Sequence, residues 1–202
     1  SPEEEDRMNT EKVPEKLPIL PLRNNVLFPG VVMPITVGRD KSIKLIQDAY
    51  KGNKIIGVVS QKDSSIEEPK YDDLYRVGTV AQIVKLLKMP DGSSTAILQG
   101  KKRMSLLKLI QPEPYLIANV NPFDEKRETK FNKESVALFD SLKDMALSII
   151  KQSPNIPSEA SFAIKNIESP TFLVNFISSH MQADVADKQK MLEEPNVLDR
   201  AN

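Results

Sequence analysis

Few residues in this chain are of a type that could do chemistry. It has one histidine, His180, and no cysteine, which excludes thiol catalysis and zinc sites built from several histidine and cysteine ligands. The carboxylate pairs Glu67–Glu68 and Asp72–Asp73 are adjacent in sequence, and in an extended chain such neighbours point to opposite sides. These pairs are therefore weak candidates for general acid–base catalysis. His180 is predicted near the end of a helix, where a histidine complements the helix dipole.

The glycines do not indicate a nucleotide site either. Gly52 and Gly57 have the spacing of a phosphate-binding loop, but Val58 and Val59 follow where that loop requires lysine and serine or threonine. No dinucleotide-binding, nucleophile-elbow or paired-histidine zinc motif occurs. We therefore expect no catalytic residue, no cofactor and no metal ligand in this chain.

The charge balance bears on possible partners. The 28 lysines and arginines equal the 28 aspartates and glutamates, so no overall field attracts the chain to nucleic acid or to an anionic membrane. Lysines gather between residues 85 and 108 and could follow a phosphate backbone, but aromatic residues form only 5% of the chain and none stands among them. Apolar runs are far shorter than the roughly 20 residues of a membrane helix. We expect neither nucleic-acid nor membrane binding.

Most of the first 125 residues are predicted to form β-strands, which would position the candidate residues of this chain. Residues 1–15 hold six acidic residues and are typical of a disordered leader. In residues 16–125, apolar and β-branched runs alternate with proline, glycine and aspartate, which predicts a closed or half-closed barrel. The turn at 89–93 makes its two long strands antiparallel. The expected strands span 17–22, 31–37, 54–61, 77–89, 94–109 and 115–123, and one helix spans 39–51.

A second part, residues 126–202, is predicted to be helical because the hydrophobic period changes from 2 to about 3.6. We expect helices near 136–150, 157–167, 170–181 and 184–192. A further helix begins near residue 195, and we expect it to continue beyond Asn202. The fold class is therefore α+β, a six-stranded barrel with one helix followed by an α-helical bundle.

Five apolar residues have no forced place in the barrel core. The odd positions of strand 31–37 are all apolar, which leaves Pro34 on the opposite face. Ile97 lies on the wetter face of strand 94–109, and the other three lie at or after the end of the first strand. Either these residues pack beneath the helical part, or they form an exposed patch suited to unfolded polypeptide. The candidate substrate-binding residues are Leu22, Phe28, Pro29, Pro34 and Ile97.

Several motifs resemble those of a known family. The segments LPILPLRN (17–24), VLFPG (26–30) and PITVGR (34–39) are followed by DLYRVGTVA (73–81) and the PDG turn (90–92). The helical half adds IESP (167–170), SHM (179–181) and ADKQKMLE (186–193). In content and order, from about residue 16 to 200, they resemble the amino-terminal domain of ATP-dependent Lon proteases.

The resemblance implies a PUA-like β-barrel followed by a helical bundle. It also implies a non-catalytic cytoplasmic domain that recognises unfolded, damaged or degron-tagged proteins and helps to assemble a homohexamer. The parent protein would be an ATP-dependent serine endopeptidase whose ATPase domain, with its ATP and Mg²⁺, lies outside this chain.

Other functions stay open at this point. Lon-type domains also occur as stand-alone adaptors, and the barrel could be a PUA-like RNA-binding module, although that second idea rests on fold analogy alone. Binding of unfolded chains should be micromolar or weaker and only mildly sensitive to salt, whereas RNA binding should fall steeply with salt. An assembly role predicts dimers that depend on concentration.

Overall fold

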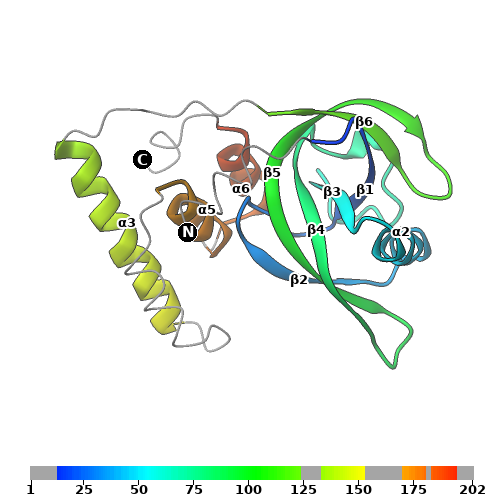
Figure 1. Cartoon of the computed structure of the whole chain (residues 1–202), viewed down its shortest axis with the longest axis horizontal. Coiled ribbons are helices and arrows are strands. Elements are labelled where there is room, and N and C mark those ends of the chain that lie inside the picture. The colour runs from blue at the N-terminus through cyan, green and yellow to red at the C-terminus, as the bar shows by residue number, and fades with distance from the viewer. Residues whose placement is uncertain (1–12, 124–132, 153–169, 181–182, 195–202) are drawn as a thin grey trace.

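The computed structural model describes residues 13–123, 133–152, 170–180 and 183–194. Its first part contains six strands, a helix and a single 3₁₀ turn, and its second part contains three described helices (Figure 1). In the first part the order is β1 (Lys16–Leu22), β2 (Val32–Val37), α2 (Asp40–Lys51), β3 (Ile55–Ser60), η1 (Tyr71–Asp73), β4 (Val77–Lys88), β5 (Ser94–Gln111) and β6 (Ile117–Pro122). The helices that follow are α3 (Lys133–Gln152), α5 (Pro170–His180) and α6 (Val185–Glu193).

The strands form one sheet that closes on itself. Their order is β2-β5-β4-β3-β1-β6, and an additional pairing between β5 and β6 closes the five strands from β5 to β6, while β2 pairs with β5 at the edge. The β1–β3 pair is parallel and the other pairs are antiparallel. The structure therefore confirms the α+β class with a six-stranded, barrel-like sheet.

The 18-residue strand β5 joins the sheet together because it pairs with β4, β2 and β6. Its first half alternates buried and half-buried residues, with Ala96, Leu98 and Gly100 inward. Register shifts along the β4 and β6 pairings let this long strand bend as the sheet closes.

Two apolar clusters fill the sheet. One contains Leu45 and Ile46 from α2, packed against side chains from β1 to β5 such as Leu20, Ile83 and Leu98. The helix is amphipathic, and its buried residues, Ser42, Leu45 and Ile46, share one face. The second cluster lies between β1, β3, β4, β5 and β6 and includes Leu17, Val59 and Met104.

Helix α6 attaches the helical part to the outside of the barrel (Figure 1). Arg103 of β5 is only 2% exposed, and its guanidinium donates to the carbonyl oxygens of Leu192 (2.9 Å) and Glu194 (2.5 Å). Gln189 donates from Nε2 to the carbonyl oxygen of Val77 at 2.8 Å. The two Arg103 bonds satisfy carbonyls at the carboxyl end of α6, which the helix itself cannot pair, and the Gln189 bond joins α6 to β4.

The predicted elements agree closely with the described ones. All six strands and the helix at 39–51 are confirmed with ends shifted by at most a few residues. Helix α3 extends the expected 136–150 helix, and Asp184 caps α6 as expected by accepting from the Asp187 backbone N–H at 2.9 Å. The expected leader at 1–15 falls almost wholly outside the described residues, and the expected helix at 157–167 does so completely. The division at residue 125 stays a prediction.

Arg103→Met should lower the free energy of unfolding by about 3 kcal/mol, because two buried carbonyls lose a charged donor. Urea unfolding followed by circular dichroism measures this change. Lys88→Met is the control, since Lys88 is an exposed basic residue at the end of β4 and its loss should change stability by less than about 0.5 kcal/mol. Equal stability of the two variants would show that Arg103 does not hold α6 on the barrel.

Candidate functional site

Exposed apolar side chains gather on the outer face of β2, β5 and β4. Val32 is 56% exposed, Val84 52%, Leu87 41% and Met89 43%. Pro34 is exposed and Ile97 is half-buried. We call Val32, Pro34, Val84, Leu87, Met89 and Ile97 the apolar face.

Strand register brings these residues together. Pro34 of β2 lies opposite Ile97 of β5, and Ile97 lies opposite Lys85 of β4. Residues directly opposite each other point to the same side of a sheet. A register shift between Ile83 and Lys85 leaves Val84 as an extra residue beside Lys85. The register thus places the apolar residues of the three strands on one face, with Lys85, Thr95 and Gln99 among them.

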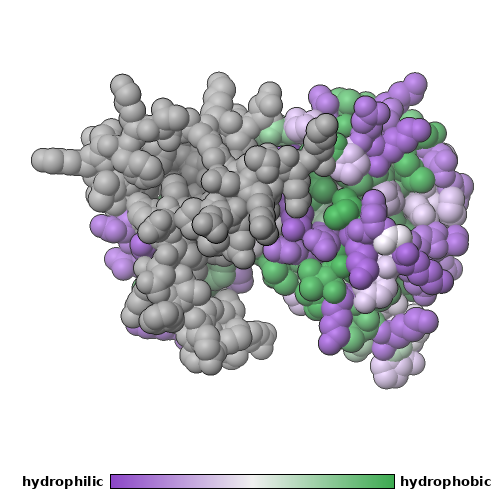
Figure 2. Space-filling model, in the orientation of Figure 1, coloured by the Kyte–Doolittle hydropathy of each residue, from purple (hydrophilic) through white to green (hydrophobic). Residues whose placement is uncertain are grey.

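Polar residues border this face. Leu87 lies opposite Thr95, which lies opposite Thr36, and the two threonine hydroxyls are 3.0 Å apart. Lys85 and Lys88 are exposed on β4. Figure 2 shows apolar surface, bordered by hydrophilic residues, over the part of the barrel where β2, β4 and β5 cross in Figure 1. An apolar patch with a polar border is typical of an interaction site.

The edge strand β2 favours contact through side chains rather than through the backbone. Among the described strands β2 pairs only with β5, and Gly100 N–H donates to the carbonyl oxygen of Val31 at 2.9 Å. This bond makes Val32–Gln99 a pair without mutual hydrogen bonds, so the backbone groups of residues 32, 34 and 36 point away from β5. Pro34 has no N–H, and an added strand would therefore lack a central donor.

Three of the five candidate residues from the sequence lie in the interior. Leu22 is 3% exposed in the cluster beneath α2, and Pro29 is also buried. Phe28 is fully buried in a third cluster, where it packs with Leu192 of α6 and with Val77. Phe28 therefore packs beneath the helical part, which is one of the two alternatives that the sequence leaves open. Pro34 and Ile97 are the two that lie together on the outer face, and substrate binding by any of the five stays a prediction.

A close backbone approach explains why Phe28 and Pro29 are buried. Gly30 N–H donates to the carbonyl oxygen of Gly100 at 2.9 Å, so the 28–30 loop lies directly on β5. A Cβ built on Gly100 would lie 2.3 Å from the carbonyl oxygen of Phe28. Only glycine fits at this crossing.

Sequence reasoning missed the part of the apolar face that comes from β4 and the turn after it, which is Val84, Leu87 and Met89. The bulge at Val84 interrupts the alternation, and Leu86 and Leu87 are consecutive leucines, so no simple parity separates inside from outside. The usable signal is the register, because alternation predicts Ile97 on the outer face and the 89–93 turn sets residue 87 close to it.

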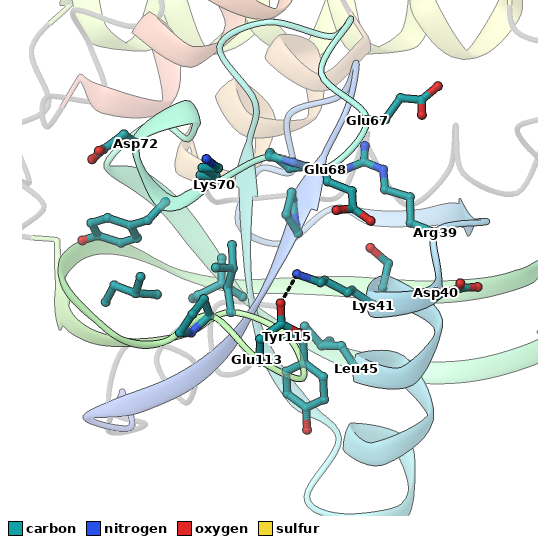
Figure 3. A pocket seen from close by; sticks show the side chains of 18 of the residues that line it. Arg39, Asp40, Lys41, Leu45, Glu67, Glu68, Lys70, Asp72, Glu113 and Tyr115 are labelled. Atoms are coloured by element: carbon teal, nitrogen blue, oxygen red, sulfur yellow. Dashed lines mark hydrogen bonds and ion pairs between the residues drawn. The ribbon is translucent and has the colours of Figure 1, made fainter.

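A separate pocket of about 780 Å³ lies beside α2 (Figure 3). Its walls come from β1, the amino end of α2, the segment 67–72 and the loop before β6. Lys41 and Glu113 meet across it with Nζ and Oε1 2.6 Å apart. Glu113 raises the pKa of Lys41 by accepting this hydrogen bond.

The remaining candidates are possible metal ligands, His180 and membrane-spanning helices. No group of three potential metal-ligating side chains occurs among the described residues. His180 is the last residue of α5, with Nδ1 2.9 Å from the carbonyl oxygen of Phe176, as fits a structural residue. No described helix is long and apolar enough to cross a membrane.

Comparison with known proteins identifies the family. Residues 16–202 match the family described as the substrate-binding domain of ATP-dependent protease La (Lon). The chain belongs to this family. A Lon protease of Flavobacterium johnsoniae is 55% identical over 201 residues, which is 100% of this chain and 25% of that relative. A Lon protease of Cytophaga hutchinsonii is 48% identical over the same length, again covering 100% of this chain and 25% of the relative.

Solved structures agree on the fold. The N-terminal domain of Lon protease from the Mycobacterium avium complex has a TM-score of 0.69 at 19% identity and covers 92% of this chain and 94% of its own. A Lon N-terminal domain protein from Xanthomonas campestris has a TM-score of 0.64 at 16% identity, with the same coverage. This chain spans about a quarter of the length of the Lon proteases that it matches.

Gly100→Ala should lower the free energy of unfolding by about 2–3 kcal/mol, because the added methyl group collides with the Phe28 carbonyl. Urea denaturation provides the measurement. Gly38→Ala serves as the matched control, since a Cβ there meets no atom within 4 Å and should change stability by no more than about 0.5 kcal/mol. If both alanine variants were equally stable, the close crossing of the 28–30 loop over β5 would be refuted.

Proposed function

We propose that this domain binds unfolded or damaged polypeptide segments, including degron-tagged ones, through the apolar face and delivers them to the catalytic part of a Lon protease. The observation that carries the proposal is the group of exposed apolar side chains on one face of β2, β5 and β4 in a member of the Lon substrate-binding family. Folded proteins bury most of their large apolar side chains, so such a surface selects segments that are exposed by unfolding.

The edge strand supports a mode of binding that tolerates many sequences. Because Pro34 removes the central backbone donor of β2, a bound segment gains its free energy from side-chain burial and not from a fixed hydrogen-bond register. Lys85 opposite Ile97 adds a weak preference for acidic residues beside the apolar ones. Each contact is weak, and we expect dissociation constants in the micromolar range or above.

The rest of the proposed function concerns the whole protein. We propose a homohexameric, ATP-dependent serine endopeptidase of the cytoplasm, in which this domain contributes to assembly and holds substrates near the ring. Weak capture raises the effective concentration of substrate at the entrance, while ATP-driven domains outside this chain do the pulling.

Replacing Leu87 and Ile97 together by glutamate should weaken binding of an unfolded protein at least about fivefold, because two carboxylates would be desolvated at the apolar contact. The probe is reduced, carboxymethylated α-lactalbumin, titrated against the 202-residue chain and followed by fluorescence anisotropy at low and moderate salt. Native α-lactalbumin should not bind, and moderate salt should have a small effect.

Leu107→Glu is the matched control for charge at an exposed apolar position. Leu107 also lies on β5 and is 58% exposed, but it is outside the apolar face. Its change should leave binding intact, and all variants should keep the thermal midpoint within a few degrees. Equal loss in both variants would contradict the proposal. Loss of self-association without loss of lactalbumin binding would assign the apolar face to assembly instead.

A further inference from the structure

The pocket beside α2 has features that the apolar face does not use. None of the six residues of the apolar face lines it. Its floor is apolar and largely buried, with Ile19 and Leu45 each 1% exposed and Leu116 9% exposed. Its volume of about 780 Å³ is that of a small-ligand site.

One wall of the pocket is formed by hydrogen-bond donors at the start of α2. Arg39 precedes the helix in an extended conformation, and its side chain does not cap the first turn. The backbone N–H groups of Asp40, Lys41 and Ser42 therefore have no acceptor within the helix, and all three residues line the pocket. Ser42 is only 6% exposed, and its hydroxyl has no hydrogen-bond partner in the described part of the chain.

A buried guanidinium nitrogen adds to this wall. Arg39 donates from Nη2 to Oε1 of Gln61 at 2.5 Å, but its Nη1 is buried without a hydrogen-bond partner among the described residues. Burial and the nearby Arg23 both lower the pKa of Arg39, against the opposing effect of Glu67. A buried charged donor without an acceptor is costly, and an anion beside it would remove that cost.

The carboxylates around the pocket, unlike these donors, are exposed to water, paired with a cation or directed away from the pocket. Glu67 and Glu68 are exposed, so that water can solvate them. Glu113 is paired with Lys41, Asp72 is 3.2 Å from the guanidinium of Arg76, and Asp40 points away from the pocket (Figure 3). Among the residues that line the pocket, the buried polar atoms without a partner are thus Arg39 Nη1, which is a donor, and the Tyr71 hydroxyl, which can donate. A ligand with several negative charges would face Glu67 and Glu68 and be repelled.

We propose that this pocket binds a single carboxylate attached to an apolar group. The carboxylate would accept hydrogen bonds from Arg39, from the Ser42 hydroxyl and from the free N–H groups of α2. The apolar group would lie against Ile19, Leu45 and Leu116. Two sources share this chemistry, the C-terminal residue of a polypeptide and a free organic acid. The proposal does not depend on binding of polypeptide by the apolar face.

The test compares a free carboxylate with its amide. A hexapeptide of five alanines and a C-terminal leucine is titrated into the ¹⁵N-labelled chain, and the same peptide with a C-terminal amide is the control. The free acid should shift the amide signals of Lys41 and Ser42 and bind about tenfold more tightly than the amide. N-acetyl-leucine represents the free-acid source.

Each outcome with these probes has a definite meaning. Binding of both acids supports the shared chemistry. Binding of the hexapeptide acid alone assigns the pocket to polypeptide C-termini, and binding of N-acetyl-leucine alone assigns it to small organic acids. If neither acid binds, or if acid and amide peptides bind equally, the proposal is overturned.

Two variants that break the same exposed ion pair make the test sharper. Lys41→Gln removes a cation from the pocket and should weaken binding of the acid about fivefold, whereas Glu113→Gln frees Lys41 and should leave binding unchanged or strengthen it. Ser42→Ala should weaken binding as well. Equal weakening by Lys41→Gln and Glu113→Gln would mean that the ion pair acts only as a structural link, and would overturn the proposal.

The Leu87 and Ile97 double variant separates this proposal from the proposed function. It should bind the hexapeptide acid as the unmodified chain does, because neither residue lines the pocket. Loss of hexapeptide binding in this variant would place the peptide on the apolar face and contradict the pocket assignment.

Discussion

The closed sheet depends on the alternation of side chains along β5. Because this strand pairs with β2, β4 and β6, its inward residues, among them Ala96, Leu98 and Met104, contribute to both main apolar clusters. Period 2 then forces the intervening residues to the outer face. One end of that face is covered by α6 at Arg103, and the other end leaves Ile97 open. Core packing therefore also determines where the apolar face lies.

The covered and open parts of this outer surface have different chemistry. At Arg103 the strand meets helix-end carbonyls, and Phe28 fills the space between the barrel and α6. At Ile97 the partners on the neighbouring strands are Pro34, which has no backbone N–H, and Lys85 beside the bulge at Val84. The first contact has defined hydrogen-bond partners, whereas the second is the kind of surface that we propose for weak binding of many sequences.

Local signals predicted the elements well, because alternation, turn residues and caps are encoded within a few positions. The outward position of Pro34 and the half-exposed Ile97 followed from parity alone. Phe28 and Pro29 could not be placed from sequence, because their burial depends on a crossing with Gly100, some 70 residues further along the chain. The β4 residues of the face were hidden by the bulge at Val84, and the pocket beside α2 joins four separate segments that no single pattern links.

The most direct test of the central claim is to map where an unfolded chain contacts this domain. Methyl signals of isoleucine, leucine and valine are recorded while carboxymethylated α-lactalbumin is added to the 202-residue chain. The account predicts shifts concentrated at Val32, Val84, Leu87 and Ile97, with Leu45 and Leu107 unchanged. Shifts centred on Leu107 and Ile110, or spread evenly over the surface, would contradict capture by the apolar face.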